Sequence, residues 1–176
     1  MIPLERISDE VFVAKDSIVV LGDEELTFIR KQALSNPRQR ARICAHRNSG
    51  DPLHEMFIAL SKQTYIQPHR HRQKSESFHI VDGEVDVVLF EDDGAIHEVV
   101  RLGSFGSGRA TFYRLDSLRY HTLVIKSEFL LMHEVTNGPF DRRLTEYAPF
   151  APGEDDPESI NNYGRRLVLQ LAAHRV

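Results

Sequence analysis

The feature that most constrains the fold is a series of short segments, between residues 38 and 135, in which apolar and polar residues alternate. In residues 40–46, Arg40, Arg42, Cys44 and His46 alternate with Ala or Ile, which puts the two sets on opposite faces of a strand. Turn-forming clusters such as residues 48–52 and 92–94 separate these segments. About nine or ten short strands at this spacing are typical of a β-barrel or β-sandwich. The sequence therefore predicts an all-β domain.

The predicted strands are residues 40–46, 54–60, 63–68, 78–81, 85–90, 96–102, 110–114, 121–125 and 129–135. Residues 103–108 contain three glycines but lack the Lys-Ser/Thr pair of a phosphate-binding loop. We therefore interpret them as a flexible loop or lid rather than a nucleotide site.

The two ends of the chain have different patterns. Residues 17–21 are β-rich, and a helix is predicted over Asp23–Ser35, with Asp23 as its N-cap and Pro37 behind its end. Pro139, Pro149 and Pro152, with Pro157 directly behind them, make residues 138–156 an extended wrapping segment, and a short helix is predicted over residues 157–169. The predicted organisation is an N-terminal strand and helix (1–37), a barrel (38–136) and a C-terminal wrap with a helix (137–176).

Composition excludes several classes of protein. The 176 residues suit a single domain, and a net charge of −4 argues against general nucleic-acid binding. The lone Cys44 forbids an internal disulfide or a cysteine-rich zinc site. No apolar run is long enough to span a membrane, and the acidic N-terminus does not resemble a signal peptide. The sequence thus predicts a cytoplasmic protein.

The residues most indicative of chemistry lie between positions 69 and 83. His69 and His71 are two residues apart, so on a strand they point the same way. A four-residue loop then lets Glu76 face them from the next strand, which ends at a turn containing Gly83. His121, from a later strand, could complete the set. We predict that His69, His71, Glu76 and His121 bind one divalent transition metal ion.

The ligand types narrow the choice of metal. Three imidazoles and a carboxylate leave two positions open on an octahedral ion, which suits Fe(II), Mn(II), Ni(II) or Co(II). Zinc more often settles as tetrahedral, and four protein ligands would fill it.

Two further groups are candidates for contact with a ligand. Arg40, Arg42 and His46 share a strand face and could bind a carboxylate or sugar phosphate, although solvated charges or ion pairs are the alternative. Glu134 shares a face with Leu130 and Met132, so it could be an acid or base of raised pKa or could be paired with an arginine.

The spacing His69-x-His71-x4-Glu76-x6-Gly83 resembles the first motif of the cupin superfamily, with Gln63 where cupins expect glycine. The run that ends at His121 resembles the second motif, with Ile125 in place of its asparagine. Residues 35–42, 65–71, 89–94 and 147–152 look like the WbuC family of cupin-fold metalloproteins. The resemblance implies a single cupin (jelly-roll) β-barrel with an N-terminal helix and a short C-terminal helix. It also implies a link to bacterial surface-polysaccharide (O-antigen) metabolism.

Three functions are compatible with these residues. The first is a metal-dependent isomerase or oxygenase that acts on a sugar or sugar-like acid, with Glu134 as proton carrier. The second is a non-catalytic metallo-cupin that binds or senses a carbohydrate. The third, a metal-free epimerase with a His–Asp or Tyr pair, is disfavoured by so complete a ligand set. Cupins often pair through barrel edges, so a homodimer is expected from the resemblance.

Overall fold

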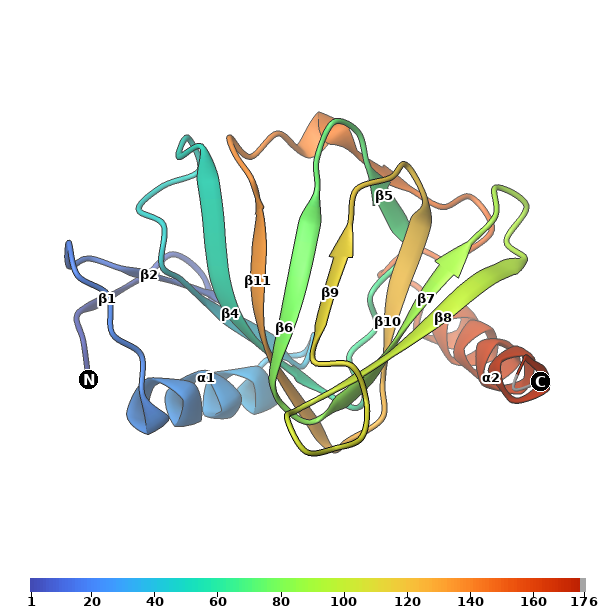
Figure 1. Cartoon of the computed structure of the whole chain (residues 1–176), viewed down its shortest axis with the longest axis horizontal. Coiled ribbons are helices and arrows are strands. Elements are labelled where there is room, and N and C mark those ends of the chain that lie inside the picture. The colour runs from blue at the N-terminus through green and yellow to red at the C-terminus, as the bar shows by residue number, and fades with distance from the viewer. Residues whose placement is uncertain (175–176) are drawn as a thin grey trace.

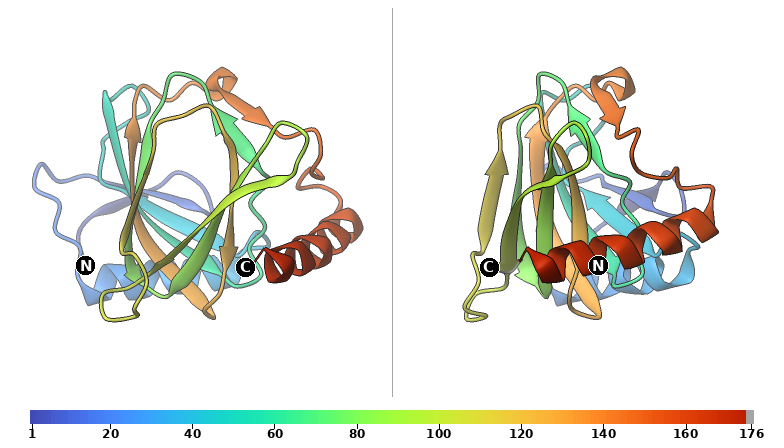
Figure 2. Two further views of the ribbon diagram at one scale, coloured as in Figure 1. Left: turned by 45° about the vertical axis from the view of Figure 1, so that its right-hand side comes forward. Right: turned by 90° about the vertical axis from the view of Figure 1, so that its right-hand side faces the viewer.

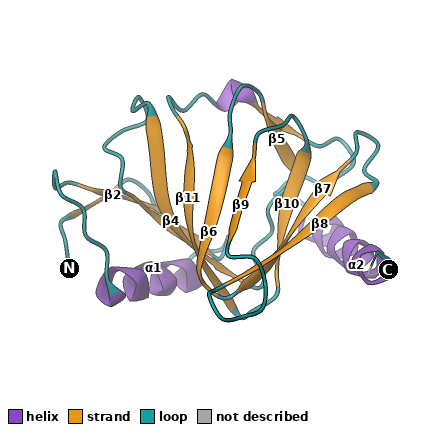
Figure 3. Ribbon diagram, viewed as in Figure 1, coloured by secondary structure: helices purple, strands orange, loops and turns teal. Residues whose placement is uncertain are grey.

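The structure is a computed structural model that describes residues 1–174, and it consists of two β-sheets that face each other with one helix on the outside of each (Figure 1). Figure 2 shows the strands curving around a common interior, and Figure 3 shows that almost all other segments are loops. The prediction of a mostly β domain is confirmed.

The larger sheet has seven strands and the smaller has five. In spatial order the larger contains β1 (Leu4–Arg6), β2 (Val11–Ala14), β3 (Arg40–Cys44), β4 (Leu53–Ser61), β11 (Phe129–Asn137), β6 (Glu76–Asp82) and β9 (Phe112–Leu115). The smaller contains β12 (Thr145–Tyr147), β5 (His69–His71), β10 (Tyr120–Ile125), β7 (Glu84–Phe90) and β8 (Ile96–Gly103). Neighbouring strands are antiparallel except β2 and β3, which are parallel.

Alternation along the strands builds the core between the sheets. Val85 and Val87 from the smaller sheet meet Leu130, Met132 and Phe78 from the larger one, and all five are buried. Burial of such apolar side chains contributes about 1.5–3 kcal/mol each. Because successive side chains point to opposite faces, this core decides which polar residues also point inward.

Helix α1 (Asp23–Ser35) has the predicted bounds and packs against β3 and β4 through the buried Ile29 and Ala33. The predicted N-cap was wrong by one residue, because Gly22 occupies that position. The Glu25 carboxylate accepts hydrogen bonds from the backbone N–H groups of Gly22 and Ile2, which stabilises the start of the helix. It thereby takes over the capping role that the sequence suggested for Asp23.

Helix α2 (Pro157–Ala173) covers the outside of the smaller sheet and is longer than predicted. Asp156 accepts a hydrogen bond from the Ser159 N–H and caps it. Tyr163, Leu167 and Leu171 pack in one apolar cluster with residues of β7 and β10, and this contact carries the helix past Gly164 and beyond residue 169. Neither helix within residues 1–174 has the length and apolar character needed to cross a bilayer.

Three strand assignments were wrong at the sequence level. Residues 63–68 form no strand; the strand starts at His69, because Pro68 has no N–H to donate. Residues 17–21 are irregular, and β1 and β2 lie earlier. Part of the wrapping segment joins the smaller sheet as β12, preceded by a short 3-10 helix, η1 (Arg142–Leu144).

The glycine-rich loop of residues 103–108 lies far from the predicted metal ligands. Gly103 pairs with Glu84 at the start of β7, whereas His121 pairs with Leu89 near its end. The loop therefore sits at the opposite end of the sheet (Figure 1), so it does not cover these ligands, and its interpretation as a flexible loop or lid stays a prediction.

Gly83 allows the tight turn between β6 and β7. Its φ is +92°, and a Cβ atom there would lie 2.3 Å from the Phe129 carbonyl oxygen. Gly106 also has a positive φ, +87°, but nothing lies within 4 Å of the corresponding position.

We predict that Gly83→Ala lowers the free energy of unfolding by about 2–4 kcal/mol, because it adds a backbone clash to the strain of positive φ. Gly106→Ala carries the strain alone and should cost about 1 kcal/mol. Urea unfolding of both variants measures the difference. Equal costs would show that the close approach at Gly83 is relieved without penalty.

Candidate metal centre

Three histidines converge inside one end of the barrel. His69 and His71 come from β5 and His121 comes from β10, where it lies directly opposite His69 in the antiparallel register. One ring nitrogen from each lies within 4.8 Å of the others, a spacing at which all three could hold one metal ion. The structure thus brings together the three imidazoles that the motif spacing singled out.

Glu76 lies against this cluster from the other sheet. It is the first residue of β6 and is buried, and its Oε1 is 2.6 Å from His121 Nε2 while its Oε2 is 3.4 Å from His71 Nε2. The two sheets therefore contribute to one site, with imidazoles from the smaller and the carboxylate from the larger.

The other ring nitrogens have partners that orient the imidazoles. His69 Nδ1 is 2.8 Å from the Gln67 carbonyl oxygen, and His121 Nδ1 is 3.1 Å from the Arg119 carbonyl oxygen. Since a carbonyl only accepts, these nitrogens donate, and the neutral rings carry their lone pairs on Nε2. His71 Nδ1 lies 3.1 Å from Thr145 Oγ1. Such hydrogen bonds behind the ligand nitrogen are typical of metal-binding histidines.

The facing atoms of Glu76 and His121 test whether these residues fit a cation. Glu76 Oε1 and His121 Nε2 are both buried and lie 2.6 Å apart, and within residues 1–174 neither has another hydrogen-bond partner. A buried carboxylate oxygen and imidazole nitrogen that face each other need a cation between them, either a proton or a metal ion. Two ligand atoms directed at a shared point in this way suit a metal ion, which would satisfy both, so the residues fit the predicted group.

Electrostatics favours the protonation states that ligands need. Burial lowers the pKa of His69 to about 4, helped by repulsion from His121. Burial alone would raise the pKa of Glu76, but His121 and His71 outweigh it and the net shift is downward. The reverse balance raises the pKa of His121, because Glu76 outweighs burial. At neutral pH, His69 is therefore neutral and Glu76 ionised, and a cation would compete with the proton that His121 shares with Glu76.

A charged cluster on the outer side of β5 holds this strand in place, and sequence reasoning missed it. Glu146 of β12 lies opposite Arg70, accepts a hydrogen bond from it at 2.6 Å and another from Arg72 at 2.8 Å. The Tyr120 hydroxyl donates to the same carboxylate at 2.7 Å, and the Arg70 guanidinium lies 4.3 Å from the Tyr120 ring centre. In the sequence near β5, only the alternation of Arg70 and Arg72 indicated an acidic partner such as Glu146.

The three residues predicted to form an anion site have different surroundings in the structure. Arg40 pairs with Glu10 at 3.1 Å and with Glu154 at 3.2 Å. Arg42 is exposed, and His46 stacks on His54 with their ring centres 4.1 Å apart. The acids around Arg40 match the ion-pair alternative for that residue. An anion site at Arg42 and His46 stays a prediction.

Glu134 faces the barrel interior with Leu130 and Met132, as the alternation predicted. It is partly buried and forms no ion pair with an arginine within residues 1–174, although the positive charge of Arg42 acts to lower its pKa. It is therefore an inward carboxylate without the charged partner that would make it purely structural.

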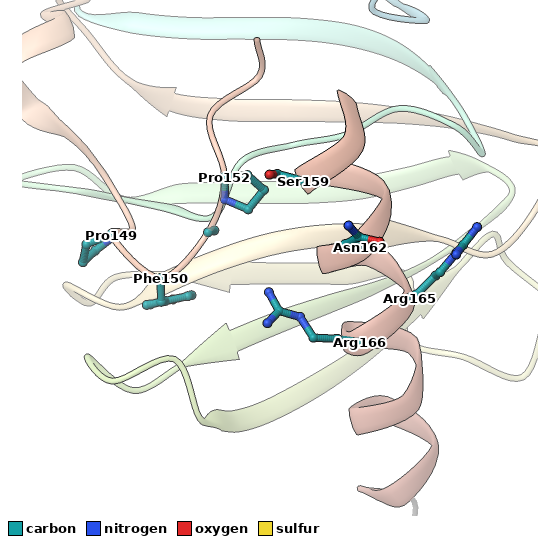
Figure 4. Close-up of a pocket in the computed structure, with 8 residues that line it drawn as sticks. Pro149, Phe150, Pro152, Ser159, Asn162, Arg165 and Arg166 are labelled. Atoms are coloured by element: carbon teal, nitrogen blue, oxygen red, sulfur yellow. The ribbon is translucent and has the colours of Figure 1, made fainter. Parts of the chain in front are cut away.

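Two surface pockets differ in their relation to the histidines. One, of about 660 Å³, is lined by His71 and by residues of the β5–β6 and β9–β10 connections. The other, of about 670 Å³, lies between α2 and residues 149–152 and is lined by Phe150, Arg165 and Arg166 among others (Figure 4). Its lining contains no histidine, cysteine or carboxylate, so only the first of these two pockets adjoins the candidate centre.

Comparison with known proteins gives few sequence matches. A family described as "Domain of unknown function (DUF6016)" matches residues 21–102, which is less than half of the chain. No curated protein matches the chain.

Solved structures match more of the chain. A conserved protein with a double-stranded β-helix domain from Klebsiella pneumoniae is 11% identical with a TM-score of 0.53, over 76% of this chain and 98% of that one. A point mutant of salicylate 1,2-dioxygenase from Pseudoaminobacter salicylatoxidans is 15% identical with a TM-score of 0.53. That match covers 73% of this chain but only 37% of the dioxygenase. A protein from Shewanella oneidensis is 13% identical with a TM-score of 0.51, over 61% and 72% of the two chains.

At such low identities these matches bear on the fold. They agree with the two facing sheets. The chain has a single cupin jelly-roll fold, also known as the double-stranded β-helix.

Proposed function

We propose that this chain is a metal-binding cupin protein in which His69, His71, His121 and Glu76 hold one divalent transition metal ion. The observation that carries the proposal is the convergence of three oriented imidazoles on a buried carboxylate whose Oε1 has no partner but His121 within residues 1–174. The donor set of nitrogen and oxygen suits Fe(II), Mn(II), Ni(II) or Co(II), and zinc is the tetrahedral alternative.

The bound ion would supply a Lewis acid that polarises a substrate oxygen, or a site for dioxygen. His71 is the ligand through which small molecules gain access, because its side chain is 20% exposed whereas His121 is 2% exposed. The same histidine lines the 660 Å³ pocket. We therefore propose this pocket as the route from solvent to the centre.

Glu134 is the candidate proton carrier of the site. Burial, reinforced by the charge of Glu76, raises its pKa to about 7. A carboxyl group with this pKa can take up or release a proton at physiological pH, as a general acid or base must. Its inward position on β11, beside β6 and its Glu76, leaves the carboxyl facing the interior that the imidazoles share.

We further propose a sugar or sugar-like small molecule as the substrate, in bacterial surface-polysaccharide (O-antigen) metabolism. The support is the resemblance of residues 65–71, 89–94 and 147–152 to the WbuC family. A titratable Glu134 on the same interior face as Glu76 favours an enzyme, either an isomerase or an oxygenase. A non-catalytic protein that binds or senses a carbohydrate is the alternative.

His69→Ala should reduce the metal content of the purified protein by about 100-fold or more, because it removes one of the four proposed ligands. Elemental mass spectrometry on the wild type and the variant measures this. His79→Ala is the matched control: it removes an exposed imidazole from β6 and should leave the metal content unchanged. Near-zero metal in the wild type, or full metal in His69→Ala, contradicts the proposal.

Glu134→Gln should stabilise the metal-free protein in a pH-dependent way. The folded pKa of about 7 lies above the ordinary 4.5, so folding favours the protonated form. The two proteins should differ least below pH 4.5, and the variant should gain about 1–3 kcal/mol over the wild type as pH rises from 4.5 to 7. Urea unfolding across this range measures the difference. A constant difference would mean that Glu134 titrates normally.

The enzyme and the binding protein are separated by turnover. Metal-loaded protein should show either oxygen uptake or nucleotide-sugar conversion, and Glu134→Gln should lower that rate by about 100-fold or more while it keeps the metal. Metal-loaded wild type without turnover in either assay would favour the binding protein.

A further inference from the structure

The pocket beside His71 has a distinct charge. Its lining consists of His71, Arg72, Gln73, Lys74 and Ser75 after β5, Arg114, Asp116, Ser117 and Leu118 around the end of β9, and Asn137. Three cationic side chains and a single carboxylate therefore surround a volume of about 660 Å³. This excess of positive charge occurs in a chain whose net charge is −4.

Two of the three cations already have partners. Arg72 pairs with Glu146 at 2.8 Å, and Arg114 pairs with Asp116 at 3.0 Å. Lys74 has no carboxylate at ion-pairing distance within the described part of the chain; its Nζ lies 5.5 Å from the Phe140 ring centre. This lysine is half-buried and is therefore the cation in this pocket with spare binding capacity.

The loop that carries Lys74 is held at both ends. The Arg72 N–H donates to the Leu144 carbonyl at 2.7 Å, and the Ser75 N–H donates to Asn137 Oδ1 at 2.9 Å. Between them, Gln73 has a φ of +59°, a conformation that costs a non-glycine residue energy. The backbone that carries Lys74 is therefore anchored on both sides, and the Phe140 ring is the neighbour of its ammonium group.

We propose that this pocket binds the carboxylate group of an acidic sugar or similar sugar-like acid, with Lys74 as its main partner and the rest of the molecule directed past His71 toward the barrel interior. The proposal rests on the proposed function for the identity of the centre and adds the charge class of its ligand. Carboxylate is favoured over a neutral hydroxyl, because a partly desolvated ammonium gains most from an anion.

The test compares two sugars that share a ring and differ at one carbon. D-Galacturonate carries a carboxylate where D-galactose carries a hydroxymethyl group. Isothermal titration of the full chain, both as purified and after removal of metal with a chelator, should show galacturonate binding about tenfold more tightly than galactose. Lys74→Met should bring the ratio close to one, and Lys74→Arg should keep most of it.

Lys31→Met is the control substitution. Lys31 is an exposed lysine on α1, which Figure 1 places at the opposite end of the molecule from the β5–β6 and β9–β10 connections. It changes the net charge as Lys74→Met does and should leave the preference intact. Thermal unfolding of all variants checks that the fold is kept, and Lys74→Arg preserves the cation if Lys74→Met unfolds.

The outcomes distinguish this inference from the proposed function. Equal affinities for the two sugars, a preference that survives Lys74→Met, or no binding of galacturonate at about 10 mM overturns the inference. Metal content is measured on the same samples. Absence of metal contradicts the proposed function, while a preference lost specifically with Lys74 supports the charged pocket in either case.

Discussion

The candidate centre depends on the pairing of one very short strand. β5 has three residues, and it is held between β10, where His121 lies opposite His69, and β12, where Thr145 lies opposite His71. Because side chains alternate between faces, a slip of one residue would turn either the β5 imidazoles or His121 away from the interior. The same alternation turns Arg70 outward, where Glu146 and Tyr120 bind it. One register therefore sets both the imidazole cluster and the ion pairs that secure it.

The pKa values of the two interior carboxylates shift in opposite directions because their charged neighbours differ, although burial acts to raise both. Glu76 lies against His121 and His71, and their influence keeps its pKa low despite burial. Around Glu134, burial and the charge of Glu76 outweigh the opposing charges of Arg42, His121 and Lys74, and its pKa rises to about 7. Environments that move the pKa values of two acids apart in this way suit them to different roles, here an ionised carboxylate beside the imidazoles and a group that exchanges protons near neutrality. The division arises from position in the barrel, since both side chains are chemically the same.

The pocket beside His71 is positively charged, although the chain as a whole has a negative net charge. Acidic residues outnumber basic ones in the whole chain, yet the pocket beside His71 gathers three cations, and Lys74 among them lacks an ion-pair partner within residues 1–174. Fields at a binding site depend on the nearest few charges, because solvent and salt screen the distant ones within about 10 Å. The net charge of the chain therefore argued against nucleic acid as a partner, but it did not describe the charge of this pocket.

Local signals in the sequence were sufficient for part of this description. The acids of its first turn and Pro37 predict the bounds of α1. Strand periodicity and one short loop predict that His69, His71 and Glu76 face one another. All of these act within a few residues along the chain, so no knowledge of the remainder is needed. The inward face of Glu134 likewise follows from alternation with Leu130 and Met132.

What only the tertiary structure decided is which strands are neighbours. The pairing of β5 with β12, the contact of Glu146 with Arg70, the distance of the 103–108 loop from the histidines and the assembly of a basic pocket around Lys74 all join residues far apart in sequence. Alternation predicts which way a side chain points, but the same alternation would suit pairing with any neighbouring strand. The choice of partner is made by packing of the whole core, and no local pattern records it.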